Sequence, residues 1–257
     1  FTQFAPINLD ACQVLSDGTL VGIACPMAPK FRDFMKSWID SVVEAGPDAI
    51  FWDEPHFSLP HFIGSKANTW GCRCDTCKSL FHDKFGYAMP AEMTDDVRKY
   101  LEWALRDFLQ FLIKYAKSQG MRNAVCLLPH EEGELGYIEN WDEYGQMEGL
   151  DVLATDPYFE LFNKDLAYVE KFAKKIVEVS RRNNLEEQLW IQGFKNAAGR
   201  EQLQIDAMDI AAKAGVRNIA VWGVDACEHL SWIRPDDPEK MWSMIVDKVK
   251  QLSREKA

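Results

Sequence analysis

The sequence predicts an α/β fold in which parallel strands alternate with amphipathic helices. Six apolar runs have the length and the two-sided hydrophobicity of buried parallel strands, at residues 20–26, 48–55, 123–132, 150–159, 188–194 and 217–224. Apolar residues recur at helical spacing between most of these runs. Strands and helices that alternate in this way are typical of right-handed βαβ units.

Helix ends are marked by local signals. Gly46 with Pro47 behind it predicts the end of a helix that starts near Pro29. Thr94 is a good N-cap for a long helix over 95–119, with acidic residues in its first turn. Further helices are expected after Asn163, over 200–215 and from Pro238.

Six strands are too few for a closed (β/α)8 TIM barrel, which has eight. The 257 residues of the chain are about the typical length of such a barrel, but an insertion such as 56–93 leaves too few residues for all eight βα units. Either residues 1–14 hide an irregular strand or the first βα units lie outside this chain, and we favour the second. We expect one TIM-barrel-like catalytic domain over residues 1–257, with a loop insertion at about 56–93. The alternative is an open doubly wound sheet, which normally has a Gly-rich phosphate-binding turn after its first strand. The sequence has no such turn.

Charge and hydropathy exclude some classes of partner. With 29 basic and 40 acidic residues the net charge is -11, which argues against nucleic acid. No apolar run approaches a membrane span of roughly 18 residues. The chain begins with Phe1, so a removed leader remains open.

Acids, histidines and aromatic residues follow the predicted strands. The carboxyl ends of strands in a barrel share one rim, where active sites lie. Carboxyl groups transfer protons at a glycosidic oxygen and aromatic faces stack on sugar rings, so this rim suits a carbohydrate substrate. Glu54 stands out, because it directly follows an apolar strand and precedes Pro55. The rim residues are Asp53, Glu54, His56, His130, Glu131, Glu132, Asp156, Tyr158, Gln192, Trp222 and Asp225.

Seven cysteines are spread unevenly along the chain. Cys72, Cys74 and Cys77 form a C-x-C-x-x-C motif, whereas Cys126 and Cys227 have apolar neighbours that predict buried packing. The role of Cys12 is open. A disulfide framework is typical of small secreted domains without a large core, which this chain does not resemble. A metal site or a group of free thiols remains for the motif.

Three segments together resemble glycoside hydrolase family 42, the β-galactosidases with a TIM-barrel catalytic domain. They are "IACPMAPKFRDFM", "FWDEPHF" and "CRCDTCKSLFHDKFGYAMP". The resemblance extends weakly to "LDVLATDPYF" and to Trp222, which matches a tryptophan that lines the sugar site. It implies that the chain begins near the third strand of the barrel. It also implies a homo-oligomer, since the family's enzymes are commonly trimers.

The resemblance implies roles for particular residues. Glu54 matches the family's acid/base, and Cys25, Cys72, Cys74 and Cys77 match its structural Zn²⁺ ligands. Four thiolates form a closed tetrahedral zinc site with no position for a water molecule. The chain departs from the family at Gln192, where the family has its nucleophilic glutamate, since an amide cannot attack an anomeric carbon. Asp53 likewise stands where the wider clan usually has asparagine.

We therefore expect a glycosidase in which Glu54 is the general acid, with Asp53, Glu131 or Asp156 as the second carboxyl group. The alternatives are a carbohydrate-binding barrel without catalysis and, less favoured, a zinc-loop interaction module. Reduced zinc thiolates favour the cytoplasm.

Overall fold

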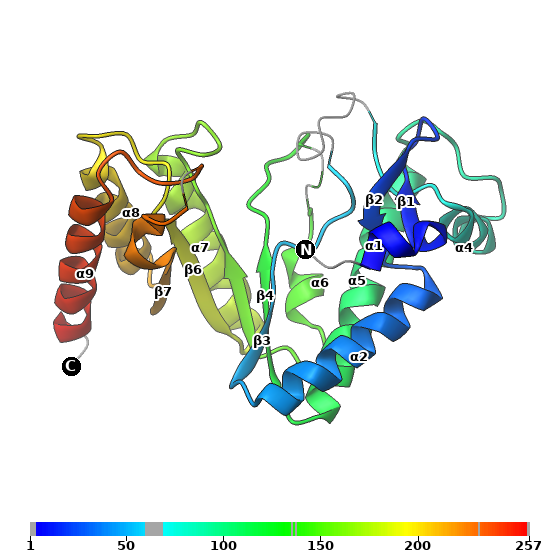
Figure 1. Ribbon diagram of the computed structural model, residues 1–257, viewed down its shortest axis with the longest axis horizontal. Helices are drawn as coiled ribbons and strands as arrows, with labels where there is room; N and C mark the ends of the chain where they lie inside the picture. The colour runs from blue at the N-terminus through cyan, green and yellow to red at the C-terminus, as the bar shows by residue number, and fades with distance from the viewer. Residues whose placement is uncertain (1–3, 60–68, 135, 137, 231, 256–257) are drawn as a thin grey trace. The chain divides into compact units, whose positions relative to one another are not determined.

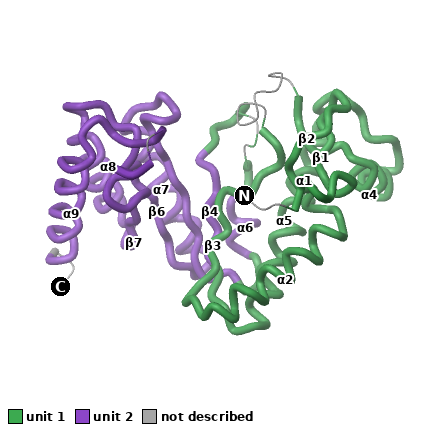
Figure 2. The backbone as a smooth tube through the Cα atoms, in the orientation of Figure 1, with its two compact units in different colours: residues 1–123, 130–140, 147–149 green, residues 124–129, 141–146, 150–257 purple. Residues whose placement is uncertain are grey.

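The computed structural model describes residues 4–59, 69–134, 136, 138–230 and 232–255 (Figure 1). The chain forms two compact units, which Figure 2 colours separately. Unit 1 contains residues 1–123, 130–140 and 147–149, and unit 2 contains residues 124–129, 141–146 and 150–257. Part of the predicted insertion at 56–93, residues 60–68, lies outside the described residues.

The main sheet has five strands whose order follows the sequence, β3-β4-β5-β6-β7. The pairs β4–β5, β5–β6 and β6–β7 are parallel, with Ala124 opposite Val152 and Gln192 opposite Trp222. All four residues of β5 are buried, as expected of a strand covered on both faces. The strands are β3 Ala49–Trp52, β4 Arg122–Leu127, β5 Val152–Thr155, β6 Glu186–Gln192 and β7 Asn218–Trp222. An α/β fold with parallel strands is thus confirmed.

Long helices connect these strands, and their ends follow the predicted signals. Gly46 ends α2 with a φ of 69°, a left-handed conformation that glycine adopts without a steric penalty. The Thr94 side chain accepts a hydrogen bond from Val97 N and caps α5. The long helices are α2 Pro29–Ala45, α5 Asp95–Ser118, α7 Leu166–Asn183, α8 Glu201–Lys213 and α9 Pro238–Glu255. None of the helices in the described part of the chain is both long and apolar enough to cross a membrane.

The prediction that residues 20–26 form a strand of the parallel sheet is wrong. Residues Leu20–Ala24 form β2, which pairs antiparallel with β1, Cys12–Val14, in a separate two-stranded sheet (Figure 1). The physical reason is the tight turn at Asp17-Gly18, where Gly18 has a φ of 89° and Leu15 N bonds to Thr19 O at 2.8 Å. The irregular strand within residues 1–14, the alternative that we did not favour, therefore exists as β1, but it belongs to a hairpin and not to the parallel sheet.

Several short elements were not predicted. Four of them have five residues or fewer, which is too few for a periodic pattern. The fifth, α4, is the longest and begins inside the cysteine motif. The short elements are α1 Phe4–Ile7, η1 Leu9–Ala11, α4 Asp75–Phe85, α6 Trp141–Gly145 and η2 Val224–Cys227.

Each unit has its own buried helix face. In unit 1, α5 buries a stripe that includes Tyr100, Phe108 and Ile113. In unit 2, α7 buries Tyr168, Phe172 and Ile176, and the Phe172 ring stacks on Trp141 at 5.8 Å between ring centroids. The helical spacing of these residues is the pattern from which both helices were predicted.

Asn123, fully buried near the start of β4, connects its own segment to three other segments of unit 1. Its Oδ1 accepts a hydrogen bond from Trp52 Nε1 at 3.0 Å. Its Nδ2 donates to Gly149 O at 3.2 Å and to Ile113 O at 3.4 Å. One amide thereby satisfies polar groups from β3, α5 and the loop before β5.

Replacing this amide by an apolar group of similar size should destabilise the protein. Asn123→Leu leaves the buried indole N–H and the carbonyl groups without this partner, so we expect the free energy of unfolding to fall by about 2–4 kcal/mol. Urea denaturation followed by tryptophan fluorescence measures the change. Gln202→Leu, at an exposed position on α8, is the control and should change stability by less than about 0.5 kcal/mol. Equal effects of the two substitutions would contradict this role for Asn123.

Candidate metal centre and active-site residues

Four cysteines from three segments of unit 1 meet in one cluster. Cys25 follows β2, Cys72 and Cys74 lie in the loop before α4, and Cys77 lies in the first turn of α4. Their four Sγ atoms lie within 4.8 Å of one another. Cys25 Sγ is 3.5 Å from Cys77 Sγ and 3.7 Å from Cys74 Sγ. The structure thus brings together the four cysteines that the sequence singled out.

Backbone hydrogen bonds fix the segments that carry the cysteines. Cys25 N donates to Ala11 O, at the end of η1, at 2.8 Å, and Arg73 N donates to Val14 O in β1 at 2.7 Å, so residues 11–14 hold both sides of the cluster. Gly71 is required by the close approach of these segments, because a Cβ at this position would lie 2.6 Å from Gln13 Oε1. The sequence around the cysteines therefore builds a rigid frame before any ligand is considered.

The cluster fits a metal ion bound by four thiolates. Sulfurs placed about 2.3 Å from a tetrahedral Zn²⁺ are about 3.8 Å apart, which is close to the two distances above. Three of the four residues are fully buried and none forms a disulfide. The Cys25 thiol, in contact with Cys74, lowers the pKa of Cys74 and favours its thiolate form. The donor set is all sulfur, which suits zinc and other thiophilic metals.

The three remaining cysteines have other environments. Cys12 is buried, and its thiol contacts Ala5 O at 3.4 Å and Asn8 O at 3.5 Å. Cys126 lies in the buried part of β4, and Cys227 packs with Phe194 and Ile233. The predicted buried packing of Cys126 and Cys227 is confirmed.

Asp53 and Glu54 directly follow β3 in unit 1. Asp53 keeps contact with solvent, yet desolvation by the surrounding protein, and next the Glu54 charge, raise its pKa to about 6. Glu54 is half-buried and has a φ of 38°, in the left-handed region that non-glycine residues rarely adopt. Two adjacent carboxyl groups with different environments are therefore present where the sequence predicted an acid.

The other rim residues of unit 1 have mixed surroundings. His56 is half-buried and its Nδ1 lies 2.6 Å from Phe57 O. His130 is buried, and Gly136 lies so close that a Cβ there would be 3.1 Å from His130 Nδ1. Glu131 is half-buried, and its backbone N–H donates to Glu134 Oε2 at 2.7 Å.

Gln192 ends β6 in unit 2 and uses both ends of its amide within the protein. Its Oε1 accepts from Leu161 N at 3.1 Å, and its Nε2 donates to Phe194 O at 2.9 Å. The residue is 1% exposed. Gln192 therefore connects the loop that follows β5 to the loop that follows its own strand.

The remaining predicted residues of unit 2 are Asp156, Tyr158, Trp222 and Asp225, of which Asp225 is exposed in the short helix η2. Asp156 is buried directly after β5, and Tyr158 is half-buried with its ring edge-on to Phe194 at 5.2 Å. Trp222 ends β7 and is 49% exposed, so its ring is available for stacking. Each of these residues lies at or just after the carboxyl end of a strand, as the sequence predicted.

A polar network around Glu160 was not predicted. The Glu160 carboxylate accepts hydrogen bonds from Arg200 Nε at 2.6 Å, Gln204 Nε2 at 2.8 Å and Asn196 Nδ2 at 2.9 Å. It lies in the same loop as Leu161, which Gln192 holds. The loop after β5 is thereby fixed from two sides. No spacing in the sequence indicates this network, because its members come from separate segments.

Left-handed backbone conformations gather in the loops that follow strands. Six non-glycine residues that follow strands have φ between 38° and 56°, an arrangement that is energetically costly and typical of functional loops. They are Glu54 after β3, Asn163 after β5, Lys195 after β6, and Asp225, Ala226 and Cys227 after β7. The carboxyl ends of these strands are thus the strained part of the fold.

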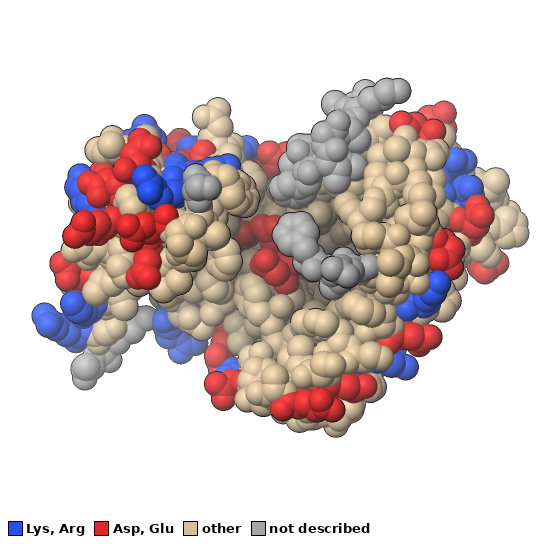
Figure 3. Space-filling model, in the orientation of Figure 1, with Lys and Arg blue, Asp and Glu red and all other residues tan. Residues whose placement is uncertain are grey.

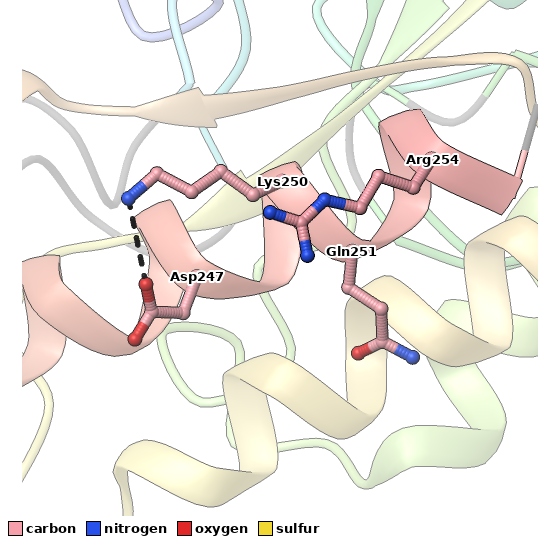
Figure 4. Close-up of a pocket in the computed structure, with 4 residues that line it drawn as sticks. All are labelled: Asp247, Lys250, Gln251 and Arg254. Atoms are coloured by element: carbon pink, nitrogen blue, oxygen red, sulfur yellow. Dashed lines mark ion pairs between the residues drawn. The ribbon is translucent and has the colours of Figure 1, made fainter. Parts of the chain in front are cut away.

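A surface pocket lies elsewhere, along α9, and is lined by Asp247, Lys250, Gln251 and Arg254 (Figure 4). Its polar contacts include an ion pair of 3.6 Å between Lys250 and Asp247, and it contains none of the predicted site residues. On the face shown in Figure 3, basic and acidic residues are interspersed. We therefore place no catalytic role in the α9 pocket.

The chain matches no protein-family model and no curated protein by sequence. Its structure is similar to a β-galactosidase from Bacillus circulans sp. alkalophilus, with a TM-score of 0.68 and 14% identity over 97% of this chain and 44% of that one. It is also similar to the PgaB (BpsB) glycoside hydrolase domain from Bordetella bronchiseptica, with a TM-score of 0.54 and 12% identity over 87% of this chain and 64% of that one. The chain thus spans less than half the length of the β-galactosidase. At this identity the likeness establishes the fold alone, an α/β partial barrel of a kind found in glycoside hydrolases.

The raised pKa of Asp53 should make the free energy of unfolding depend on pH. The folded protein holds this proton more tightly than the unfolded chain, whose carboxyl has the ordinary value of 3.8. The free energy of unfolding should therefore fall as the pH rises from about 4 to about 6, through this group alone. Asp53→Asn removes the charge. Relative to the wild-type protein, it should raise the free energy of unfolding more at pH 8 than at pH 4, by about 1 kcal/mol after solvent screening.

Urea denaturation at the two pH values measures this difference. Asp48→Asn, at an exposed position just before β3, is the control and should have the same small effect at both. A greater loss of stability for Asp53→Asn at pH 8 than at pH 4 would contradict the assignment.

Proposed function

We propose that this protein is a glycoside hydrolase in which Glu54 acts as the general acid/base. The fold that it shares with a β-galactosidase supports this class of reaction, as do the resemblance of its motifs to family 42 and the carboxyl groups that follow β3. The observation that carries the proposal is the pair Asp53 and Glu54 itself. Glu54 has a costly left-handed backbone directly beside a carboxyl whose pKa is raised to about 6.

In this proposal the substrate is a carbohydrate, and Glu54 protonates the glycosidic oxygen as the bond to the anomeric carbon breaks. The second carboxyl group is Asp53, Glu131 or Asp156. His56, His130, Tyr158 and Trp222 bind the sugar through hydrogen bonds and stacking. An eight-stranded barrel completed by βα units outside this chain, a homo-oligomeric assembly and a cytoplasmic location are further parts of the proposal.

Gln192 separates this protein from a retaining β-galactosidase. A retaining enzyme needs a carboxylate nucleophile, and the amide at this position is occupied by Leu161 N and Phe194 O. If the second carboxyl group activates water instead, the reaction inverts the anomeric configuration, with carboxyl groups roughly 6.5–9.5 Å apart. The same observation favours the second candidate function, a carbohydrate-binding barrel without catalysis.

The test of the catalytic proposal is a screen of aryl glycosides with the wild-type protein and Glu54→Gln. The substitution keeps the shape of the side chain and removes the transferable proton, so kcat should fall by about 10²–10⁴-fold with folding unchanged. Glu44→Gln, at an exposed position on α2, is the control and should retain full activity.

Hydrolysis that is unaffected by Glu54→Gln would contradict the assignment of the acid. Saturable sugar binding without hydrolysis by any aryl glycoside would instead favour the binding barrel. Circular dichroism of each variant confirms that it is folded.

We further propose that Cys25, Cys72, Cys74 and Cys77 bind one structural Zn²⁺. A site made only of thiolates leaves no open position for water, so the ion would stabilise the fold without entering the reaction. Bound metal contributes folding free energy, and here it would hold the hairpin, the loop before α4 and α4 together.

Loss of one ligand should therefore cost both metal and stability. Cys74→Ser should reduce the zinc content from about one ion per chain and should increase hydrogen exchange over residues 69–85. Cys12→Ser is the matched control, because Cys12 is buried near the cluster but contacts backbone carbonyl groups. Metal analysis and hydrogen-exchange mass spectrometry measure the two effects. A wild-type protein without zinc after gentle purification would contradict the proposal.

A further inference from the structure

Tyr100 lies on α5 with its side chain fully buried beside Cys77, Cys25 and Cys74. Its ring meets Phe81 edge-on, with 5.8 Å between the ring centroids and 67° between the planes. Phe81 follows Cys77 by four residues on α4, so the two side chains share the face of α4 that packs on α5. Residue Tyr100 of α5 therefore packs against α4, the helix that carries Cys77.

The Tyr100 hydroxyl is buried and has no hydrogen-bond partner in the described part of the chain. Sulfur atoms are nevertheless close to it. Among the cysteines, Cys77 interacts most strongly with Tyr100, followed by Cys25 and Cys74. Buried hydroxyl groups nearly always have a hydrogen-bond partner, and the Cys77 sulfur is the candidate for this one.

A metal ion bound by four thiolates would explain why a hydroxyl group is buried beside the cysteines. Four negative sulfurs around a divalent cation leave two net negative charges, which are costly in a buried site unless hydrogen-bond donors face them. The nearby cations are engaged elsewhere: Arg73 Nε donates to Pro90 O at 3.0 Å, and Lys78 Nζ pairs with Asp75 at 3.1 Å.

We propose that Tyr100 is a positioning residue of the metal centre, whose O–H donates a hydrogen bond to the metal-bound sulfur of Cys77. This inference rests on the proposed metal site. The hydrogen bond lowers the energy of the thiolate lone pairs and fixes α4 against α5. It therefore slows release of the ion, as hydrogen bonds to metal ligands do at other sites.

The test compares Tyr100→Phe with Tyr87→Phe. Tyr87 belongs to the same aromatic cluster, 5.2 Å from Phe81 between ring centroids, but its hydroxyl donates to Asp96 Oδ2 at 2.9 Å on the exposed side. Release of Zn²⁺ to an excess of a colorimetric chelator should be about tenfold faster in Tyr100→Phe. In protein loaded with Co²⁺, the sulfur-to-metal charge-transfer band should move to longer wavelength, because the sulfur lone pairs rise in energy. Tyr87→Phe should leave both unchanged.

A spectrum and a release rate for Tyr100→Phe that equal those of Tyr87→Phe would overturn the inference and leave the metal site standing. A wild-type protein that takes up neither Zn²⁺ nor Co²⁺ would overturn both. If Tyr100→Phe does not fold, 3-fluorotyrosine at position 100 keeps the hydroxyl and makes it a stronger donor. The Co²⁺ band should then move to shorter wavelength, and an unmoved band would overturn the inference.

Discussion

The contact of four thiols in a single buried cluster is the constraint on which the first part of the chain depends. The segments that carry them are short: β1 has three residues, β2 has five, and α4 has 11. Elements of this size are marginal alone, because each fixes many backbone angles for few hydrogen bonds. The segments that carry the cysteines stabilise these elements, since Cys25 N and Arg73 N both donate hydrogen bonds to carbonyl groups within residues 11–14.

The frame around the cysteines extends to the segment that carries the candidate acid. Gln13, in the middle of β1, is 1% exposed, and its Nε2 donates to Ala24 O at 3.1 Å. Its Oε1 accepts from Ser58 N at 2.9 Å, four residues after Glu54. A change in the cysteine frame can therefore reach the loop after β3 through one buried amide. In the proposed function, the cysteines would support this loop without taking part in the chemistry.

Sequence reasoning succeeded where the controlling interactions are local. Gly46 and Thr94 set helix ends through their own backbone conformation or side chain, so both were predicted. It failed for Leu20–Ala24, whose partner strand is only three residues long, although Asp17-Gly18 is a recognisable hairpin turn. The bonds of Gln192 and the network around Glu160 join residues that are far apart in sequence. Their arrangement needs the folded backbone, and no spacing encodes it.

The central claim, that four sulfurs bind one zinc ion, is tested most directly by X-ray absorption at the zinc edge of the purified protein. The account predicts a single shell of four sulfur atoms at about 2.3 Å, with no oxygen or nitrogen ligand. Zinc in a mixed shell of sulfur with nitrogen or oxygen would contradict it, because a closed thiolate site admits neither. A protein that contains no zinc would contradict it outright.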